Sequence, residues 1–299
     1  MYQHSSGALT ELTFEPTEMG ASANGISNSG IISGAETTLL GLRAGFWTAT
    51  GGSMLLTGGD GSSEWAVAAA DGGTVLGNYG GSGSPGSAAL LWAPSGYARV
   101  VLPGLRCDHC ARLMISANAI NNSGVAVGQS LSDVYDNGVL VSGGLFAVEW
   151  QSGTVSSLGS LQSSGSSAAY GINDSSDVVG SSRVGQATGA PSHAFLYRQG
   201  TMTDLGTLQG DTNSSADSVN DRKQIVGVSS NAAGAQRAFL YESGQMYDLN
   251  SLIDPGDPLV GLVTLEEAVS ISSNGWIAVN GTDSRDTGWR RAFLLIPSH

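Results

Sequence analysis

The chain repeats one short β-pattern six times, and this repeat limits the possible folds more than any other feature of the sequence. Each copy has an apolar segment, a polar turn rich in Asn, Asp, Ser or Gly, and a second apolar segment that usually ends in Gly. The copies begin at Gly25, Ala69, Ala119, Gly171, Ser218 and Ser270. Residues of these types accept the backbone geometry of tight hairpin turns. Each copy is therefore predicted to form strand, turn and strand.

A second element follows each hairpin and predicts two further strands. An Ala is followed three positions later by an aromatic or large apolar residue, and in five copies a Gly then opens a fourth segment. The sixth copy stops before its fourth segment, but Gly7–Leu12 matches Gly200–Leu205. We therefore expect an all-β fold, a six-bladed β-propeller of four-stranded antiparallel blades, closed by the N-terminal strand that completes the last blade.

This interpretation makes residues 1–299 a single β-propeller domain. The expected blades span 20–57, 62–103, 114–159, 165–206, 212–250 and 264–297, the last of them completed by 7–13. A closed ring leaves no free sheet edge, so we expect a monomer.

The charge balance excludes two classes of partner. Twelve Lys and Arg stand against 25 Asp and Glu, which gives a net charge of −13. Such a charge repels nucleic acid and anionic lipid. No apolar run reaches the ~18 residues of a membrane-spanning helix, so we expect no membrane insertion by this domain. The first fifteen residues also lack the pattern of a signal peptide.

The C-terminal half carries a recognisable repeat motif. His193-Ala-Phe-Leu-Tyr197, with Gly200-Thr-Met-Thr-Asp-Leu-Gly206, resembles the HAF-type extracellular repeat, and segments starting at Arg237 and Arg291 are close variants. The resemblance is strong over 165–299. It implies a bacterial protein that is secreted or displayed at the cell surface, in some cases as the passenger of an autotransporter. It implies no catalytic residue, and we expect His193 to pack or hydrogen-bond at the start of a strand.

Cys107 and Cys110 form the most conspicuous local motif, Cys-Asp-His-Cys. A zinc site would need more ligands, and no second pair of closely spaced cysteines occurs. We expect a short disulfide, which fits an oxidising compartment. Reduced thiols and metal or redox chemistry are the alternatives.

The sequence contains few motifs of metal-binding or catalytic sites. Four acidic pairs could hold a structural calcium ion, although none has the spacing of an EF-hand: Asp133 with Asp136, Asp174 with Asp177, Asp254 with Asp257, and Asp283 with Asp286. No metal site and no other cofactor is expected. The Gly-x-Ser-x-Gly and His-Glu-x-x-His motifs of hydrolases are absent, and no catalytic residue is nominated.

Long segments are expected to form loops on one face of the disc, at 103–115, 129–145, 181–193 and 280–290. Loops on a rigid scaffold often carry binding residues. Aromatic, acidic and guanidinium side chains within or near these segments suit a sugar or a protein. The candidate ligand-binding residues are Tyr135, Asp136, Arg183, Glu266, Arg285 and Trp289, with solvated loop residues as the alternative.

These observations favour an extracellular or cell-surface binding or adhesion module that recognises a glycan or an extracellular protein without catalysis. A carbohydrate-active propeller enzyme, either a glycoside hydrolase or a lyase, is one alternative. A structural passenger segment of an autotransporter is another, and whether the chain is an enzyme is left open.

Overall fold

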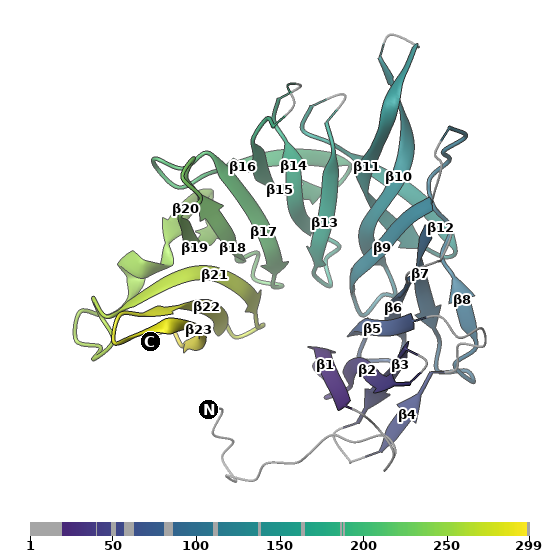
Figure 1. Cartoon of the computed structure of the whole chain (residues 1–299), viewed down its shortest axis with the longest axis horizontal. Coiled ribbons are helices and arrows are strands. Elements are labelled where there is room, and N and C mark those ends of the chain that lie inside the picture. The colour runs from purple at the N-terminus through teal and green to yellow at the C-terminus, as the bar shows by residue number, and fades with distance from the viewer. Residues whose placement is uncertain are drawn as a thin grey trace. The chain divides into compact units, whose positions relative to one another are not determined.

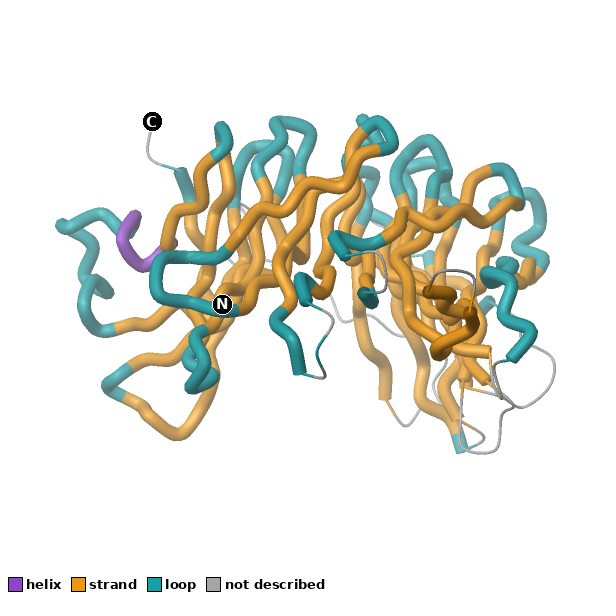
Figure 2. Tube along the Cα trace, turned by 90° about the horizontal axis from the view of Figure 1, so that it is seen from above, coloured by secondary structure: helices purple, strands orange, loops and turns teal. Residues whose placement is uncertain are grey.

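The fold consists almost entirely of antiparallel strands (Figure 2). The computed structural model describes residues 20–39, 41–48, 52–56, 63–80, 86–109, 113–136, 139–162, 165–185, 187 and 189–297. Its contacts divide the chain into two compact units, 1–101 and 102–299. The helical element of the described part is the 3-10 helix η1, Leu249–Leu252. No described helix could therefore cross a bilayer.

The first unit contains eight strands that pair with their neighbours in chain order. Strands β1 to β4 form one antiparallel run, and β5 to β8 form another. Their bounds are β1 Gly20–Ile26, β2 Ile32–Thr38, β3 Gly41–Trp47, β4 Ser53–Leu55, β5 Ser63–Ala69, β6 Val75–Gly80, β7 Gly86–Trp92 and β8 Arg99–Val101.

The second unit contains fifteen strands that pair in the same way, and its groups of strands follow one another in chain order (Figure 1). Their bounds are β9 Leu113–Ile120, β10 Ala126–Asp136, β11 Val139–Gln151, β12 Thr154–Gly159, β13 Ser167–Ile172, β14 Val178–Arg183, β15 Ser192–Arg198, β16 Thr201–Gly206, β17 Asn213–Val219, β18 Ile225–Ser230, β19 Gln236–Glu242, β20 Gln245–Asp248, β21 Val263–Ile271, β22 Ile277–Asp283 and β23 Asp286–Leu295.

The cores lie between successive groups of strands. In one cluster Val179 on β14 and Ala194 on β15 pack with Ala216 on β17 and Phe239 on β19. The recurring Ala of the third strand is fully buried at this position, where a larger side chain would hold the two layers apart. Each group of strands therefore depends on the next for its apolar burial.

Every first strand carries a β-bulge at the same place, and the bulge explains the recurring Gly. In β13 the bulge lies at Tyr170, and the preceding Ala169 pairs with Gly180 on β14. A Cβ at Gly180 would lie 1.9 Å from the carbonyl oxygen of Ala168. Similar close approaches, at 2.0 to 2.4 Å, occur at Gly34, Gly77, Gly128, Gly227 and Gly281. In five of the six groups the second strand carries Gly beside this bulge, where a side chain would meet backbone. In β21 Val279 takes this place, and Gly281 lies beside a second bulge of the same strand.

Replacing Gly180 with Ala is expected to lower the free energy of unfolding by about 1–3 kcal/mol, because the methyl group must displace backbone. Gly72→Ala is the matched control, since a Cβ there would meet no atom within 4 Å. Urea unfolding of both variants provides the measurement. A Gly180→Ala protein as stable as the control would contradict this explanation of the repeat.

An asparagine in the first turn of successive groups ties each group to the next. The side-chain amide of Asn121 donates to the carbonyl of Asn173 (3.1 Å), Asn173 donates to Asn220 (3.1 Å), and Asn220 donates to Ser272 (3.0 Å). The amide oxygen of each Asn also accepts a backbone N–H of its own turn. The turn residues expected from hairpin geometry therefore also join neighbouring layers.

The expectation of a closed six-bladed propeller is wrong. The described strands do not divide into six separate four-stranded sheets, and none of the sheets that they form is closed. The last sheet consists of β21, β22 and β23, and no described strand pairs along the outer edge of β23. The segment 7–13, which was expected to complete this sheet, lies outside the described residues. The expected single domain, its blade limits and the monomeric state stay predictions.

Two of the expected long loops are strands instead. Most of segment 129–145 belongs to the hairpin of β10 and β11, whose paired residues run from Ala126 with Trp150 to Asp136 with Val139. Most of segment 280–290 belongs to β22 and β23. In each hairpin the backbone N–H and C=O groups of one strand form hydrogen bonds with those of the other strand. Each hairpin can therefore extend beyond the rest of its group of strands. The polar residues that suggested loops lie on these extensions.

Candidate functional site

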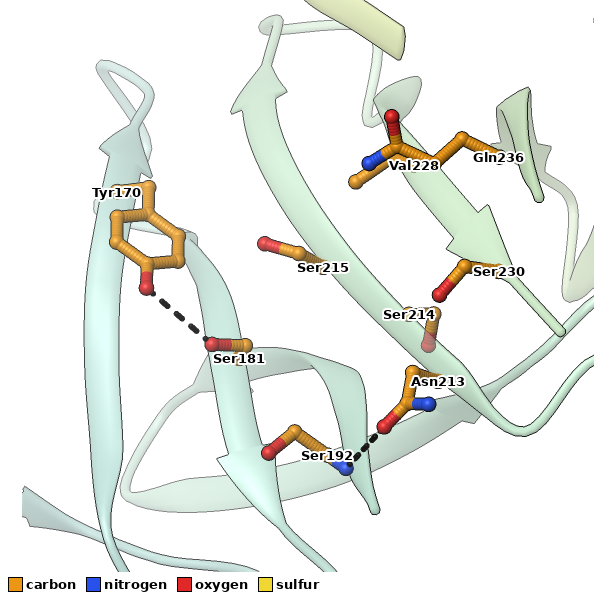
Figure 3. A pocket seen from close by; sticks show the side chains of 9 residues that line it. All are labelled: Tyr170, Ser181, Ser192, Asn213, Ser214, Ser215, Val228, Ser230 and Gln236. Atoms are coloured by element: carbon orange, nitrogen blue, oxygen red, sulfur yellow. Dashed lines mark hydrogen bonds between the residues drawn. The ribbon is translucent and has the colours of Figure 1, made fainter. Parts of the chain in front are cut away.

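The second unit has an open depression of about 240 Å³ between the group β13–β16 and the group β17–β20 (Figure 3). Hydroxyl and amide side chains from both groups dominate its lining. The lining residues are Tyr170, Ser181, Ser192, Asn213, Ser214, Ser215, Val228, Ser230 and Gln236. One wall thus consists of residues from β13, β14 and β15, and the other of residues from β17, β18 and β19.

Tyr170 is the large aromatic side chain of this depression. It occupies the bulge of β13, which frees its side chain from the regular alternation of the strand. Its residue is 36% exposed, and its hydroxyl accepts a hydrogen bond from Ser181 at 3.4 Å (Figure 3). The arrangement offers a ligand one aromatic face and a polar edge.

Part of the lining also serves the structure. The Ser214 hydroxyl donates to the carbonyl of Gly206 (2.5 Å) and accepts the N–H of Ala194 (2.8 Å). The N–H of Ser192 donates to the side-chain oxygen of Asn213 (3.1 Å). These bonds join the group β13–β16 to the group β17–β20. The paired strands, and not a loop, therefore determine the shape of the depression.

Asp217 lies in the bulge of β17, directly beyond Ser215, and its carboxylate is 3.1 Å from the Ser215 hydroxyl. Burial raises the pKa of Asp217 to about 7, and the negative charge of Glu267 on β21 adds to this rise. The Ser215 hydroxyl acts in the opposite direction. The carboxyl group beside the depression therefore changes its charge near neutral pH.

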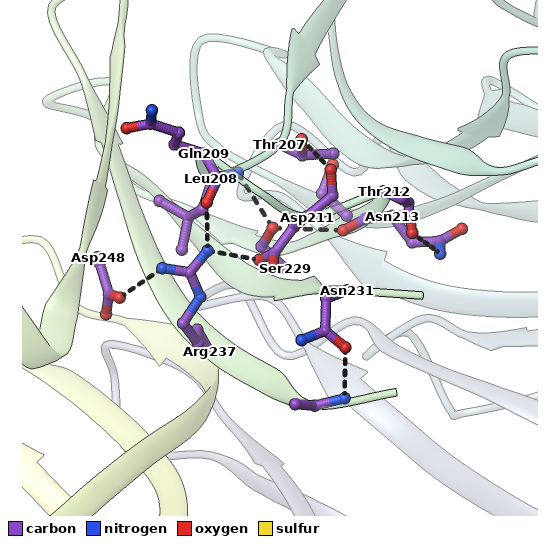
Figure 4. Close-up of polar contacts among 12 residues, drawn as sticks. Thr207, Leu208, Gln209, Asp211, Thr212, Asn213, Ser229, Asn231, Arg237 and Asp248 are labelled. Atoms are coloured by element: carbon purple, nitrogen blue, oxygen red, sulfur yellow. Dashed lines mark hydrogen bonds and ion pairs between the residues drawn. The ribbon is translucent and has the colours of Figure 1, made fainter. Parts of the chain in front are cut away.

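An ionic network fixes the connection that leads into β17 (Figure 4). The Arg237 guanidinium lies 3.0 Å from carboxylate oxygens of both Asp211 and Asp248. It also donates to the carbonyl of Gln209 (3.0 Å). Burial alone would lower the pKa of Arg237, but the two carboxylates raise it overall. The network holds β19 against the 207–213 segment.

The equivalent pair in the preceding group is His193 with Asp204, at 2.9 Å. His193 therefore makes a cross-strand contact at the start of β15, as expected. The His or Arg of the repeat motif and the Asp of the following strand form one structural unit, and no catalytic role is needed to explain them.

Three of the candidate ligand-binding residues lie in the last sheet. Glu266 pairs with Arg290 (3.1 Å), and Arg285 pairs with Asp283 (2.6 Å). The Arg285 hydrogen bonds hold the pKa of Asp283 below its usual value. Trp289 is 76% exposed on β23. These contacts are internal to the sheet.

Of the other three candidates, two lie on β10 and one lies on β14. Tyr135 and Asp136 end β10, and their side chains lie outside the described part. Arg183 ends β14, where its N–H donates to the carbonyl of Ser166. None of the four candidates with described side chains lines the depression.

The cysteine motif is described in part. Cys107 is disulfide-bonded, and Cys110 lies outside the described residues. Asp133 accepts the backbone N–H of Asp108 (2.9 Å) and lies 3.2 Å from His109. Asp133 therefore fixes this segment against β10.

Asp174 and Asp177, one of the acidic pairs considered for calcium, have protein partners. Asp174 accepts two hydrogen bonds from Asn122, both at 2.9 Å, and Asp177 pairs with Arg198 at 2.6 Å. Within the described residues no group of three or more His, Cys, Asp or Glu side chains could hold a metal ion. Structural calcium stays an untested prediction.

The lining residues were missed because Ser and Asn are ordinary in a chain of this composition. One signal could have found Tyr170 among them. Each repeat contains Ala, one variable residue, and then Gly, Ala or Ser. The variable residue is the bulged one, and in the second unit it is Asn118, Tyr170, Asp217 and Val269.

Comparisons with known proteins identify the architecture. No protein-family model and no curated relative matches the chain. The acylaminoacyl peptidase of Pyrococcus horikoshii is similar at a TM-score of 0.53 and 9% identity, over 92% of this chain and 44% of the peptidase. A prolyl endopeptidase is similar at 0.57 and 12%, over 88% and 39%. The tricorn protease is similar at 0.50 and 10%, over 90% and 30%.

These similarities overturn the expectation of a non-catalytic extracellular adhesion module for a glycan or a protein, because the similar structures are those of peptidases. The chain spans less than half the length of each of them. The HAF-type resemblance and the secreted location stay predictions. At such low identities the comparisons show the fold, and the chain has β-propeller character.

Proposed function

We propose that this chain serves a peptidase as its propeller, and that the depression between β13 and β17 binds the peptide substrate. The depression carries the proposal, because its two walls present hydroxyl and amide groups from neighbouring sheets. An extended peptide offers N–H and C=O groups that such side chains can bind. The fold similarity to peptidases supports the same assignment.

The proposal assigns peptide binding, and not bond cleavage, to these residues. A serine needs an adjacent base to become a nucleophile. The lining contains five serines but no His and no Cys. The proposed peptidase system therefore cleaves its substrate with residues outside this depression.

The aromatic ring of Tyr170 is expected to contribute most to binding. Aromatic side chains in the centre of an interface often cost 1 kcal/mol or more when truncated, so Tyr170→Ala should weaken peptide binding by about tenfold. The measurement is fluorescence anisotropy with a labelled, unstructured peptide of mixed sequence.

Tyr247→Ala is the matched control, since Tyr247 lies on β20 and does not line the depression. It should leave the affinity unchanged. If wild-type protein binds no peptide, or if both variants lose affinity equally, the proposed site is wrong.

A further inference from the structure

The bulged residues of the first strands form a row with one member in each group. In the second unit the row consists of Asn118, Tyr170, Asp217 and Val269. The Asn118 amide reaches the next first strand and donates to the carbonyl of Ala169 at 2.7 Å. Tyr170 likewise faces lining residues of β17 across the depression. In these two groups the bulge therefore directs a side chain toward the next first strand.

Tyr170 and Asp217 are consecutive members of this row, and Tyr170 lines the depression while Asp217 lies behind the lining residue Ser215. Ser215 connects them, because it lines the depression and its hydroxyl lies 3.1 Å from the carboxylate of Asp217. A ligand that covers Tyr170 and extends along β17 would meet the carboxyl group next. The two side chains differ in chemistry, one being aromatic and the other acidic.

No cationic side chain of the described residues forms an ion pair with Asp217. The charge of Glu267 on β21, which has the same sign, acts on it and raises its pKa. Arg290 on β23 lies 3.1 Å from Glu266 and 3.6 Å from Glu267, so its charge is shared between those two acids. Asp217 is thus a half-buried acid that forms no ion pair with a cationic side chain of the described residues.

We infer that Asp217 is a specificity-determining residue, which selects peptides that carry Arg or Lys next to an aromatic or apolar residue held by Tyr170. This inference rests on the proposed peptide binding and names its substrate class. A ligand guanidinium or ammonium would form a charge-assisted hydrogen bond with the carboxylate. The net charge of −13 favours the approach of such a peptide.

The test uses labelled Gly-Ser peptides that differ only in a central pair, which is Phe-Arg, Phe-Met or Ala-Arg. Affinities are measured by anisotropy for the full chain, for Asp217→Asn and for Asp257→Asn. The last variant removes an exposed carboxylate at a distant turn and controls for net charge. Wild type and Asp257→Asn should bind Phe-Arg about tenfold more tightly than Phe-Met. Asp217→Asn should bind both peptides equally, with the wild-type affinity for Phe-Met.

The outcomes separate the inference from the proposed function. If Asp217→Asn keeps the preference for Phe-Arg, the inference is wrong, while binding of Phe-Met to wild type would still support peptide recognition. If Ala-Arg binds as tightly as Phe-Arg, the role given to Tyr170 fails. If wild-type protein binds none of the three peptides, the proposed function itself fails.

Discussion

Replacing Arg198 with Met is expected to lower the free energy of unfolding by about 3 kcal/mol, because it leaves a buried carboxylate without its counter-charge. Arg198 binds Asp177 through two hydrogen bonds of 2.6 Å. The Asp177 side chain is 4% exposed. Its remaining partner there is Asn173, whose amide lies 3.4 Å away. That neutral contact cannot replace a guanidinium.

The measurement is urea unfolding followed by tryptophan fluorescence, with two companion variants. Arg198→Lys keeps the charge but loses the paired geometry, so an intermediate loss is expected. The double variant Asp177→Asn with Arg198→Met removes both charges and should recover much of the stability. A double variant no more stable than Arg198→Met would show that the unpaired charge is not the cause.

Asp217→Asn should stabilise the protein above neutral pH. The pKa of Asp217 is about 7 in the folded chain and 3.8 in the reference state. Between these values the folded protein holds a proton that the unfolded chain has released, so this group's contribution to stability falls as the pH rises. Asn stays neutral at every pH. At about pH 8 the variant should therefore be more stable than wild type by roughly 2–4 kcal/mol.

Below about pH 3 the two proteins should be equally stable, because Asp217 is then largely protonated in both the folded and unfolded states. Urea unfolding across this pH range gives the difference between variant and wild type, in which the titration of other groups cancels. Glu267→Gln removes the like charge and should give a smaller gain of the same sign. A difference that does not change with pH would contradict the raised pKa.

The repeated strands could be predicted because their signals are local. The turn residues and the recurring Gly locate the hairpins, and the bulge facing Gly180 explains why that position tolerates no side chain. The expected hydrogen bond of His193 at the start of a strand is also present, and Arg237 makes the equivalent contact in the next group. Their partners, Asp204 for His193 and Asp248 for Arg237, lie on the next strand.

The closed ring could not be derived from local signals. Counting repeats predicts strands, but closure depends on pairing between segments far apart in the chain, which no local pattern encodes. The loop predictions failed for a related reason. Polar residues such as Gln129 and Asp133 suggested a loop, yet they pair with Ala147 and Gly143 across a long hairpin.

The candidate site was missed because it depends on which strands become neighbours. Tyr170 and Ser215 are distant in sequence and meet only when β13 and β17 lie side by side. The six residues chosen from the sequence were conspicuous for their type, whereas the lining is made of common residues at special backbone positions. Searching for the variable residue after the repeated Ala would have singled out Tyr170 and Asp217.

Photo-crosslinking tests peptide binding in the depression most directly. A peptide with a photoreactive phenylalanine analogue in place of Phe, beside Arg, is irradiated with the full chain, and the attachment sites are mapped by mass spectrometry. We predict attachment within Ser167–Ile172, which carries Tyr170, and within Asn213–Val219, which carries three of the lining residues. Unlabelled competitor peptide should reduce this attachment. Attachment confined to other strands, or none that a competitor reduces, would contradict the account.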